Sequence, residues 1–310
     1  MSGQQPWVMA VQADAAGAGE RDRLARSLEG RIPGHSDWIL LSTCHRVELY
    51  GFGSVPDLDH GLHLETGDRA VRHLIRVAAG LESAIVGEDE VLHQVREALS
   101  QARAVRTLDG RLQRLFETAI AAGRRARAGR TAASGNLAQS ALAWLQERSR
   151  LAGRTVLVVG AGRMGSALAH SARLAGADVT IASRDEARAR RLAHVYGGTG
   201  TDLAGGAALA PESAAVAVAL AGTWTEFQPL RGELPPIADI SAPPALDASV
   251  RARLNGGYLG IDDLYALPLA PPPGYIDGAD RVVASKTDEY IGWLAGSRRP
   301  GARRAPFQSE

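Results

Sequence analysis

The sequence predicts an α/β protein with an N-terminal α+β domain, a second domain built on a parallel sheet, and a final helix. Two observations support this prediction. Short apolar runs alternate with helical periodicity over residues 1–150, whereas residues 154–185 read as strand, glycine-rich turn, helix and strand. The chain of 310 residues, 45% of them hydrophobic, is long enough to bury two cores. We expect domain boundaries that divide the chain into residues 1–136, 137–276 and 277–310.

The N-terminal domain is expected to combine strands with several helices. Apolar runs such as Trp38–Ser42 fit short buried strands. Val71, Leu74, Ile75 and Ala78 follow the i, i+3, i+4, i+7 spacing of an amphipathic helix. By the same criteria we expect strands at 7–12, 38–42 and 47–51, and helices at 21–29, 68–80, 88–104, 109–130 and 136–149.

The second domain opens with the apolar strand Thr155–Val159, followed by a glycine-rich turn and a helix of small residues. A second strand, with the sequence VTIA, comes next. Later apolar stretches at 214–222 and 236–241 supply further strands of a doubly wound, Rossmann-type sheet. A proline-rich linker at 268–274 then precedes a final helix at 277–295.

The glycine-rich turn fits the pattern G-x-G-x-x-G between a strand and a helix, the context that gives this short pattern its meaning. Gly160 permits the tight turn, Gly162 allows a pyrophosphate to approach the backbone, and Gly165 allows the helix to pack closely on the strand. The positive end of the helix dipole then faces the phosphates. We therefore expect a dinucleotide site that also includes Arg163 and Met164.

The end of the second strand indicates which dinucleotide is bound. Enzymes that use NAD usually place an acidic residue there to accept a hydrogen bond from the ribose 2′-hydroxyl, whereas this strand ends in Ser183-Arg184. Because arginine stabilises a 2′-phosphate, NADPH is the expected cofactor. Asp185 is expected to cap the following helix instead.

The overall charge of the chain does not identify a binding partner, but basic residues are unevenly distributed along the sequence. The chain has 35 basic and 34 acidic residues, but residues 103–130 carry eight arginines against two acidic residues. This segment is either a phosphate-facing surface or a solvated helix face. A second basic cluster, formed by Arg298, Arg299, Arg303 and Arg304, fits a solubilising end of the chain.

Other patterns exclude whole classes of function. The chain has no apolar run of 18 residues and no secretory signal, so we expect a cytoplasmic protein that does not interact with membranes. His60 and His63 have a spacing found in metal sites, but no third or fourth ligand is evident. A metal site is therefore not expected.

Cys44 is the only cysteine, so it cannot form an internal disulfide or a multi-cysteine zinc cluster. It lies between two predicted strands in Ser42-Thr43-Cys44-His45-Arg46, where an imidazole and a guanidinium can stabilise a thiolate. A reactive nucleophile and a packed structural thiol both fit this setting.

The surrounding sequence resembles the glutamyl-tRNA reductase family. Residues Leu41–Tyr50 read LSTCHRVELY, close to the family signature LSTCNR-x-E-x-Y. The resemblance extends in the family's order from residue 38 to about residue 295. The further matching blocks are Ala70–Ser83, Gly87-Glu88, Gln94-Val95, the glycine-rich turn, Asp239–Pro243 and Ile261–Leu264.

This resemblance implies a specific reaction. The Cys44 thiolate would attack the ester that joins glutamate to its tRNA, releasing the tRNA and leaving a thioester. Hydride from NADPH would then reduce the thioester to glutamate-1-semialdehyde, a tetrapyrrole precursor. Glu-tRNA is therefore the expected partner, and a downstream glutamate-1-semialdehyde aminomutase is a candidate recipient of the labile aldehyde.

The resemblance also assigns site residues. His73 matches the family histidine that assists proton transfer or positions the substrate, although a histidine beside an apolar stripe is otherwise an ordinary polar-face residue. Arg46, a natural partner for a substrate carboxylate, belongs to the expected glutamyl pocket. The other expected pocket residues are Thr43, Glu48, Ser83, Glu88 and Gln94.

The chain also departs from the family pattern. His45 replaces the usual asparagine and His93 the usual glycine, and both could alter the acyl pocket. The chain stops soon after Trp293, where family members continue into a dimerisation domain, so the expected oligomeric state is open. Two alternatives stay open as well: a reductase of another aminoacyl-tRNA, and a non-catalytic NADPH- or tRNA-binding regulator.

Overall fold

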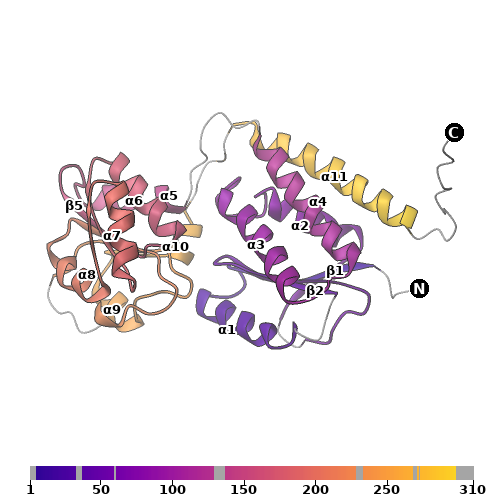
Figure 1. Ribbon diagram of the computed structural model, residues 1–310, viewed down its shortest axis with the longest axis horizontal. Helices are drawn as coiled ribbons and strands as arrows, with labels where there is room; N and C mark the ends of the chain where they lie inside the picture. The colour runs from indigo at the N-terminus through magenta and orange to yellow at the C-terminus, as the bar shows by residue number, and fades with distance from the viewer. Residues whose placement is uncertain are drawn as a thin grey trace, which may run out of the picture.

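The computed structural model describes residues 5–32, 37–58, 61–128, 137–227, 233–267, 271 and 273–297. These residues form two domains, each with its own sheet (Figure 1). The N-terminal sheet has four strands in the order β2-β3-β1-β4, and the second sheet has six in the order β10-β9-β8-β5-β6-β7. The predicted α/β class is therefore confirmed.

The N-terminal sheet is antiparallel and separates two apolar layers. Its strands are β1 (Pro6–Gln12), β2 (Trp38–Ser42), β3 (Arg46–Phe52) and β4 (His63–Thr66). Because side chains alternate along a strand, Val8 and Tyr50 face one core while Trp7 and Leu49 face the other. Strand β4 was not predicted, since Leu64 is the only large hydrophobic residue in its sequence HLET.

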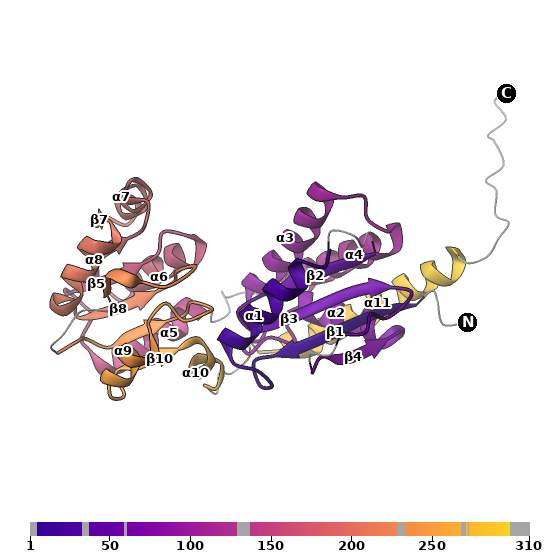
Figure 2. The same ribbon diagram turned by 90° about the horizontal axis from the view of Figure 1, so that it is seen from below.

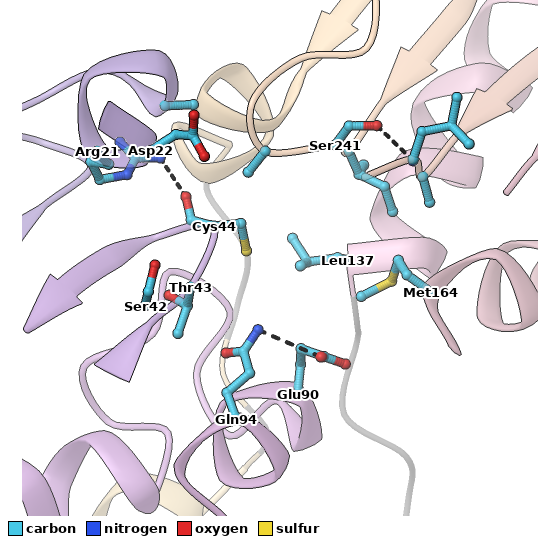
Figure 3. A pocket seen from close by; sticks show the side chains of 15 residues that line it. Arg21, Asp22, Ser42, Thr43, Cys44, Glu90, Gln94, Leu137, Met164 and Ser241 are labelled. Carbon is cyan, nitrogen blue, oxygen red and sulfur yellow. Dashed lines mark hydrogen bonds between the residues drawn. The ribbon is translucent and has the colours of Figure 1, made fainter. Parts of the chain in front are cut away.

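Helices cover both faces of this sheet (Figure 1). Helix α1 (Ala18–Glu29) packs on one face through Ala25 and Leu28. On the other face lie α2 (Asp68–Ala78), α3 (Asp89–Val105) and α4 (Gly110–Arg127), which are the three helices predicted between residues 68 and 130. The turn between β2 and β3, which carries the cysteine, is directed toward the second domain (Figure 3).

The second sheet is parallel throughout. Strand β5 (Thr155–Val159) pairs with β6 (Asp178–Ala182) on one side and with β8 (Ala215–Val218) on the other. The remaining strands are β7 (Thr199–Thr201), β9 (Ile237–Asp239) and β10 (Tyr258–Gly260). The strand order thus reverses between β5 and β8, the point where doubly wound sheets bind their ligands.

Helices surround the parallel sheet. They are α5 (Leu137–Arg148), α6 (Arg163–Leu174), α7 (Glu186–Val195), α8 (Leu203–Leu209), α9 (Ala248–Arg253) and α10 (Ile261–Tyr265), with 3-10 turns at Ala210–Glu212 and Thr225–Phe227. Helix α6 begins just after the glycine-rich turn, so its N-terminus lies at the carboxyl end of β5. Figure 2 shows α10 at the junction of the two domains, beside α1.

The final helix, α11 (Tyr275–Ser297), returns to the N-terminal domain and packs along α2 and α4 (Figure 1). Tyr275, Val283 and Tyr290 are buried in the core that those helices share. The Tyr275 hydroxyl donates a hydrogen bond to the Ala79 carbonyl oxygen (2.6 Å). The helix that the sequence assigned to a separate C-terminal segment therefore contributes to the N-terminal core, and both ends of the second domain lead back to that core.

Candidate functional site

A cavity of about 350 Å³ lies between the two domains, and the Cys44 side chain points into it (Figure 3). The N-terminal domain contributes Arg21, Thr43 and Gln94 among its lining residues. The second domain contributes Met164 from the first turn of α6, together with Ala219, Leu220, Ile240, Ser241 and Ala242, which follow β8 and β9. The cavity therefore joins the thiol to the ligand-binding edge of the parallel sheet.

A tight turn between β2 and β3, formed by residues 43–45, presents Cys44 and is called the cysteine loop. The hydroxyl oxygen of Thr43 accepts hydrogen bonds from the backbone N–H groups of His45 and Arg46, both at 3.1 Å. The Thr43 N–H in turn donates to the Arg46 carbonyl oxygen (2.9 Å). Thr43, predicted as a pocket residue, therefore also shapes the loop that carries the thiol.

The Cys44 thiol contacts the second domain directly. Its sulfur lies 2.7 Å from the hydroxyl oxygen of Tyr265, the last residue of α10. Burial of the thiol and the charge of Glu88 raise the pKa of Cys44 to about 12, a shift that the Tyr265 hydrogen bond only partly offsets. In this docked arrangement, in which α10 touches the cysteine loop, the thiol is protonated at neutral pH. Tyr265 was not among the predicted site residues, although it directly follows the matching block Ile261–Leu264.

A second interdomain contact holds the cysteine loop from α1. Arg21 is 2% exposed and donates hydrogen bonds to the carbonyl oxygens of Ala16 and Cys44. Arg21 also pairs with Asp262 of α10 (2.9 Å), whose other carboxylate oxygen accepts a hydrogen bond from the Ala18 N–H (3.1 Å). Asp262 thereby connects the second domain to the start of α1 and, through Arg21, to the Cys44 backbone. Helical periodicity gave no signal for this role of Arg21.

Adjoining the cysteine loop, the buried residues Arg46, Glu48 and Tyr50 and the half-buried His73 form a network centred on the carboxylate of Glu48. This carboxylate accepts a hydrogen bond from the Tyr50 hydroxyl (2.5 Å) and contacts His73 Nε2 (2.9 Å) and Arg46 Nη1 (3.3 Å). Burial alone would raise the pKa of Glu48, but the charges of His73 and Arg46 lower it to about 2. At His73, where burial would lower the pKa, the Glu48 carboxylate outweighs burial and raises it.

This network gives two predicted site residues, Arg46 and His73, partners within the N-terminal domain. Arg46 is 1% exposed, and its guanidinium contacts Glu48, the Glu82 carbonyl oxygen and His45 Nδ1 (3.2 Å). The carboxylate partner of Arg46 in this structure is Glu48, and its pairing with a substrate carboxylate stays a prediction. His73 lines a separate cavity of about 560 Å³ and is connected to the cysteine loop through Glu48 and Arg46.

The remaining predicted pocket residues differ in their access to the thiol cavity. Gln94 lines the cavity, and its amide donates a hydrogen bond to Glu90 (3.5 Å; Figure 3). Ser83 and Glu88 are both buried, and burial raises the pKa of Glu88 to about 7. The structure thus brings Thr43, Cys44 and Gln94 together in one cavity, whereas Glu48, Ser83 and Glu88 are buried and are not among the residues that line it.

The two histidines that depart from the expected signature lie in different surroundings. The His45 ring packs edge-on against the ring of Tyr265, with centroids 4.6 Å apart and planes at 73°. Burial and the charge of Arg46 lower the pKa of His45 to about 4, so this imidazole is neutral at neutral pH. His93 on α3 instead pairs with Glu97 (3.6 Å). Of the two histidines, His45 is the one that contacts a partner of the thiol.

The glycine-rich turn has the backbone geometry that a dinucleotide requires. Gly160 has a φ of 120°, and a Cβ there would overlap the Ala219 carbonyl oxygen. A Cβ on Gly165 would overlap the Gly160 carbonyl oxygen, which would push α6 away from β5. At Gly162, by contrast, no other atom lies within 4 Å of the Cβ position. The turn is therefore closed on its protein side and open where a pyrophosphate would rest.

The two residues that directly follow β6, Ser183 and Arg184, are those expected to hold the 2′-phosphate of the cofactor. Ser183 is buried, and Arg184 next to it is exposed. Asp185 accepts a hydrogen bond from the backbone of α7 (2.9 Å) and caps that helix, as predicted. Arg163, which was expected at the dinucleotide, pairs with Glu90 of the N-terminal domain. Arg184 is therefore the exposed cation that directly follows the strand.

Most arginines of the basic segment at 103–130 have partners within the N-terminal domain. Arg127 is 9% exposed and donates to the Ala78 carbonyl oxygen (2.7 Å), and Arg103 pairs with Glu117. The other engaged arginines are Arg106, Arg111 and Arg114. The exposed arginines of this segment are Arg103, Arg114, Arg124 and Arg125, and a phosphate-facing surface stays a prediction for them. Arg130 and the second basic cluster lie outside the described residues.

Of the two histidines with the H-x-x-H spacing, the structure describes only His63. His63 is exposed and lies 3.8 Å from Glu65, whereas His60 is outside the described residues. In the part of the chain that the structure describes, no group of three or more His, Cys, Asp or Glu side chains could hold a metal ion. Across the same ranges, no helix is both long and apolar enough to cross a membrane.

Comparison with known proteins divides the chain into two parts. Residues 10–129 match the family model described as Glutamyl-tRNAGlu reductase, N-terminal domain. Residues 141–267 match the model described as Shikimate / quinate 5-dehydrogenase. The first match ends just after α4 and the second begins within α5, so the two matches follow the division of the chain between the two sheets.

Two relatives that match most of the chain are both described as glutamyl-tRNA reductases. The chain is 32% identical over 306 residues to Glutamyl-tRNA reductase 2 of Nocardioides sp., covering 84% of this chain and 67% of that protein. It is 35% identical over 291 residues to a glutamyl-tRNA reductase of Thermus thermophilus, covering 86% and 74%. The solved glutamyl-tRNA reductase of Methanopyrus kandleri is 28% identical, with a TM-score of 0.46 and coverage of 96% and 80%. The chain thus spans about two thirds to three quarters of the length of the first two relatives.

Proposed function

The chain belongs to the glutamyl-tRNA reductase family, and on this premise we propose that it reduces the glutamyl group of Glu-tRNA to glutamate-1-semialdehyde with NADPH, through a thioester on Cys44. The reaction would provide the precursor for tetrapyrrole synthesis. The observation that carries the proposal is the shared cavity, which is lined by Cys44 and by residues at the carboxyl ends of β5, β8 and β9. A thioester on Cys44 would therefore lie within reach of a reductant held by the second domain.

The second domain supplies residues that fit NADPH. The open side of the turn at Gly162 and the free N–H groups at the start of α6 would hold the pyrophosphate. Ser183 and Arg184 would hold the 2′-phosphate, because they follow β6 and Arg184 is exposed. Met164, which belongs to this turn, lines the cavity that holds the thiol and would pack against the bound cofactor. When bound, NADPH supplies the hydride for the reduction.

Cys44 would act in two steps. Its thiolate would attack the ester carbonyl of Glu-tRNA to form the thioester, and its sulfur would later leave when the aldehyde forms. Attack requires loss of the thiol proton, which the docked arrangement disfavours because burial raises the pKa of Cys44. Movement of Tyr265 and α10 away from the loop would expose the thiol to water and lower this pKa. We therefore assign acylation to an open arrangement of the domains and reduction to the docked one.

The other residues of the N-terminal domain would bind the substrate or position the loop. Thr43 and Gln94 line the cavity and would contact the glutamyl group. Glu48 would hold Arg46 and His73 in place, so that the turn carrying Cys44 keeps its shape. The exposed arginines Arg124 and Arg125 would contact tRNA phosphates. The aldehyde product would pass to an aminomutase.

An assay with a panel of charged tRNAs tests this proposal. Purified protein and NADPH would be incubated with Glu-tRNA and with other aminoacyl-tRNAs while aldehyde formation is measured. We expect turnover with Glu-tRNA that is lost in Cys44→Ser and retained in Ser42→Ala, a control at another lining residue of the same cavity. Undiminished turnover in Cys44→Ser would remove the thioester from the mechanism.

The same assay separates the alternatives, neither of which the named relatives favour. Turnover with a different aminoacyl-tRNA and none with Glu-tRNA would identify a reductase of another amino acid. Absence of turnover with every charged tRNA, in protein that binds NADPH, would identify a regulator.

A further inference from the structure

Tyr265 brings a hydroxyl group from the second domain to the Cys44 sulfur. The two atoms lie 2.7 Å apart, and Tyr265 ends α10. Burial and the charges of Cys44 and Glu88 raise the pKa of Tyr265 well above its ordinary value, so the hydroxyl keeps its proton at neutral pH. Tyr265 is therefore a lasting hydrogen-bond donor beside the atom that would carry the substrate.

Acylation of Cys44 changes the hydrogen bonding of the Tyr265 hydroxyl. In the free protein, either the thiol or the hydroxyl can donate the hydrogen bond. A thioester has no proton on sulfur, so Tyr265 is then the donor of the pair. The carbonyl oxygen of the thioester is attached to the carbon bonded to sulfur. A donor at hydrogen-bond distance from Cys44 Sγ is therefore within reach of this oxygen when the acyl group turns toward α10.

We propose that Tyr265 is a catalytic hydrogen-bond donor for the reduction step, stabilising the negative charge that develops on the oxygen of the Cys44 thioester. The inference rests on the proposed function, because it requires an acylated Cys44. A donor that is held in place before charge develops needs no reorganisation during the reaction, which makes such groups large contributors to catalysis.

The thioester carbon accepts the hydride from NADPH and forms a C–H bond, while the π pair of the C=O bond moves onto oxygen. Tyr265 donates its hydrogen bond to this oxyanion. When the C=O bond re-forms, the C–S bond breaks and its electron pair leaves with the Cys44 sulfur, which then takes a proton from water. The thioester is reduced to the aldehyde, and NADPH is oxidised to NADP⁺.

His45 is a positioning residue for Tyr265. Its ring packs edge-on against the tyrosine ring, with centroids 4.6 Å apart. Arg46 donates a hydrogen bond to His45 Nδ1 (3.2 Å), and the low pKa of His45, caused by burial and by Arg46, keeps the imidazole neutral. The histidine that replaces the expected asparagine after Cys44 thus gains a specific partner in this chain.

Because Tyr265 belongs to the second domain, we expect its hydroxyl to affect the reduction step and not acylation. Helix α10 belongs to the second domain and meets the N-terminal domain through Tyr265 and through Asp262, which pairs with Arg21. In the open arrangement required for acylation, Tyr265 is away from the thiol. Removal of its hydroxyl should therefore slow reduction and leave acylation unchanged.

Tyr265→Phe removes the hydroxyl and keeps the ring that His45 contacts. Tyr196→Phe is the matched control, because it removes a hydroxyl from the same domain that bonds to Ser166 (3.0 Å) and not to the thiol. Both variants and the unsubstituted protein would be acylated with Glu-tRNA carrying a ¹³C-labelled glutamyl carbonyl, without NADPH. Infrared spectroscopy with NADP⁺ added, to favour the docked arrangement, reports the thioester C=O stretch. Rapid mixing with NADPH reports the rate of hydride transfer.

We expect Tyr265→Phe to shift the C=O stretch to higher wavenumber and to slow hydride transfer roughly 100-fold, the usual effect of losing one such donor. Its acylation rate and melting temperature should equal those of Tyr196→Phe. An unshifted stretch, or an equal slowing of acylation and reduction, would overturn the role of Tyr265. If the unsubstituted protein forms no acyl-enzyme, the proposed function itself is contradicted, and the role of Tyr265 is overturned with it.

Two substitutions of His45 test its positioning role. His45→Asn removes the ring contact, so reduction should slow by less than in Tyr265→Phe while acylation is retained. His45→Phe keeps an aromatic edge against Tyr265 and should restore most of the reduction rate. Equal losses in the two variants would overturn the positioning role.

Discussion

The cysteine loop and the glycine-rich turn face the same cavity, but they are stabilised by opposite means. Besides the local hydrogen bonds of Thr43, the loop is held by side chains from distant segments, with Arg21 bound to its backbone and Tyr265 bound to its thiol. The turn is held by close backbone approach, with Gly160 and Gly165 occupying positions where a Cβ would overlap a carbonyl oxygen. The properties of the loop therefore depend on charge and domain contact, whereas those of the turn depend on the absence of side chains.

This difference shows which half of the site can change during a reaction. The close contacts of Gly160 and Gly165 lie within the second domain, so we expect the turn to keep its shape and hold a cofactor when the domains separate. We expect the ionisation of the Cys44 thiol to change with domain contact, because burial is the main cause of its raised pKa. Substitutions on the two sides should therefore have separable effects.

The largest effect is expected from Glu48→Gln, in the network that supports the cysteine loop. The substitution removes the negative charge between Arg46 and His73, and a buried charge left without its partner typically costs about 3–5 kcal/mol. Urea unfolding would measure this loss. Glu65→Gln, which removes a more exposed carboxylate on β4, should cost no more than about 0.5 kcal/mol. Equal losses would show that the network does not support the loop.

The same network predicts a pH dependence of stability. The pKa of Glu48 is about 2 in the folded protein and 4.5 ordinarily, so its contribution is complete above about pH 4.5 and is lost as the pH falls toward 2. The difference in unfolding free energy between the unsubstituted protein and Glu48→Gln should therefore shrink over this interval. A difference that stays constant would contradict the assigned pKa.

On the other side of the cavity, Gly165→Ala should lower the unfolding free energy by about 1–3 kcal/mol, because its Cβ would overlap the Gly160 carbonyl oxygen. Gly162→Ala is the matched control: its Cβ meets open space, so stability should be unchanged while NADPH binding weakens. Thermal unfolding and fluorescence titration with NADPH would measure the two effects. A loss of stability in Gly162→Ala would contradict the assignment of open space to the cofactor.

A smaller effect is expected from Arg184→Ala. Removal of a charged partner of the 2′-phosphate should raise the Michaelis constant for NADPH by roughly tenfold, as expected for one hydrogen bond to a charged group. The constant for NADH should change little. Arg188→Ala, another arginine near the start of α7, serves as the control. Equal changes for the two cofactors would contradict the role of Arg184.

The smallest effect is expected at the interdomain contact itself. Asp262→Asn weakens the pair with Arg21, so the domains should separate more often and the thiol should ionise more readily. Alkylation of Cys44 by iodoacetamide at neutral pH should become severalfold faster, since thiolate is the reactive form. Asp22→Asn, which removes a carboxylate that lines the same cavity and pairs with Arg26, should leave the rate unchanged. A slower reaction in Asp262→Asn would contradict the link between docking and the thiol pKa.

The sequence could predict features whose determinants lie close together in the chain. The strand, the glycine spacing and the following helix are contiguous, so the shape of the turn at Gly160–Gly165 follows from local rules. The same holds for the turn that carries Cys44, which Thr43 closes through bonds to the next residues. Helix α11 was predicted as a helix, but its packing on the N-terminal domain was not. Periodicity shows that a helix has an apolar face and does not show which element packs against that face.

Contacts between distant segments could not be predicted in this way. Arg21 and Asp262 are 241 residues apart, and Tyr265 is 221 residues from Cys44. Nothing in the local pattern around these residues indicates that they meet. Arg46 illustrates the same limit, because its charge predicts a carboxylate partner but does not distinguish a substrate from Glu48.

Mass spectrometry of the acylated protein tests the central claim most directly. The protein would be incubated with Glu-tRNA in the absence of NADPH, quenched in acid and digested. We predict a glutamyl adduct on the peptide that contains Cys44, its disappearance with aldehyde release after NADPH is added, and its absence from Cys44→Ser. Aldehyde formation without any adduct on Cys44, or at an undiminished rate in Cys44→Ser, would contradict the account.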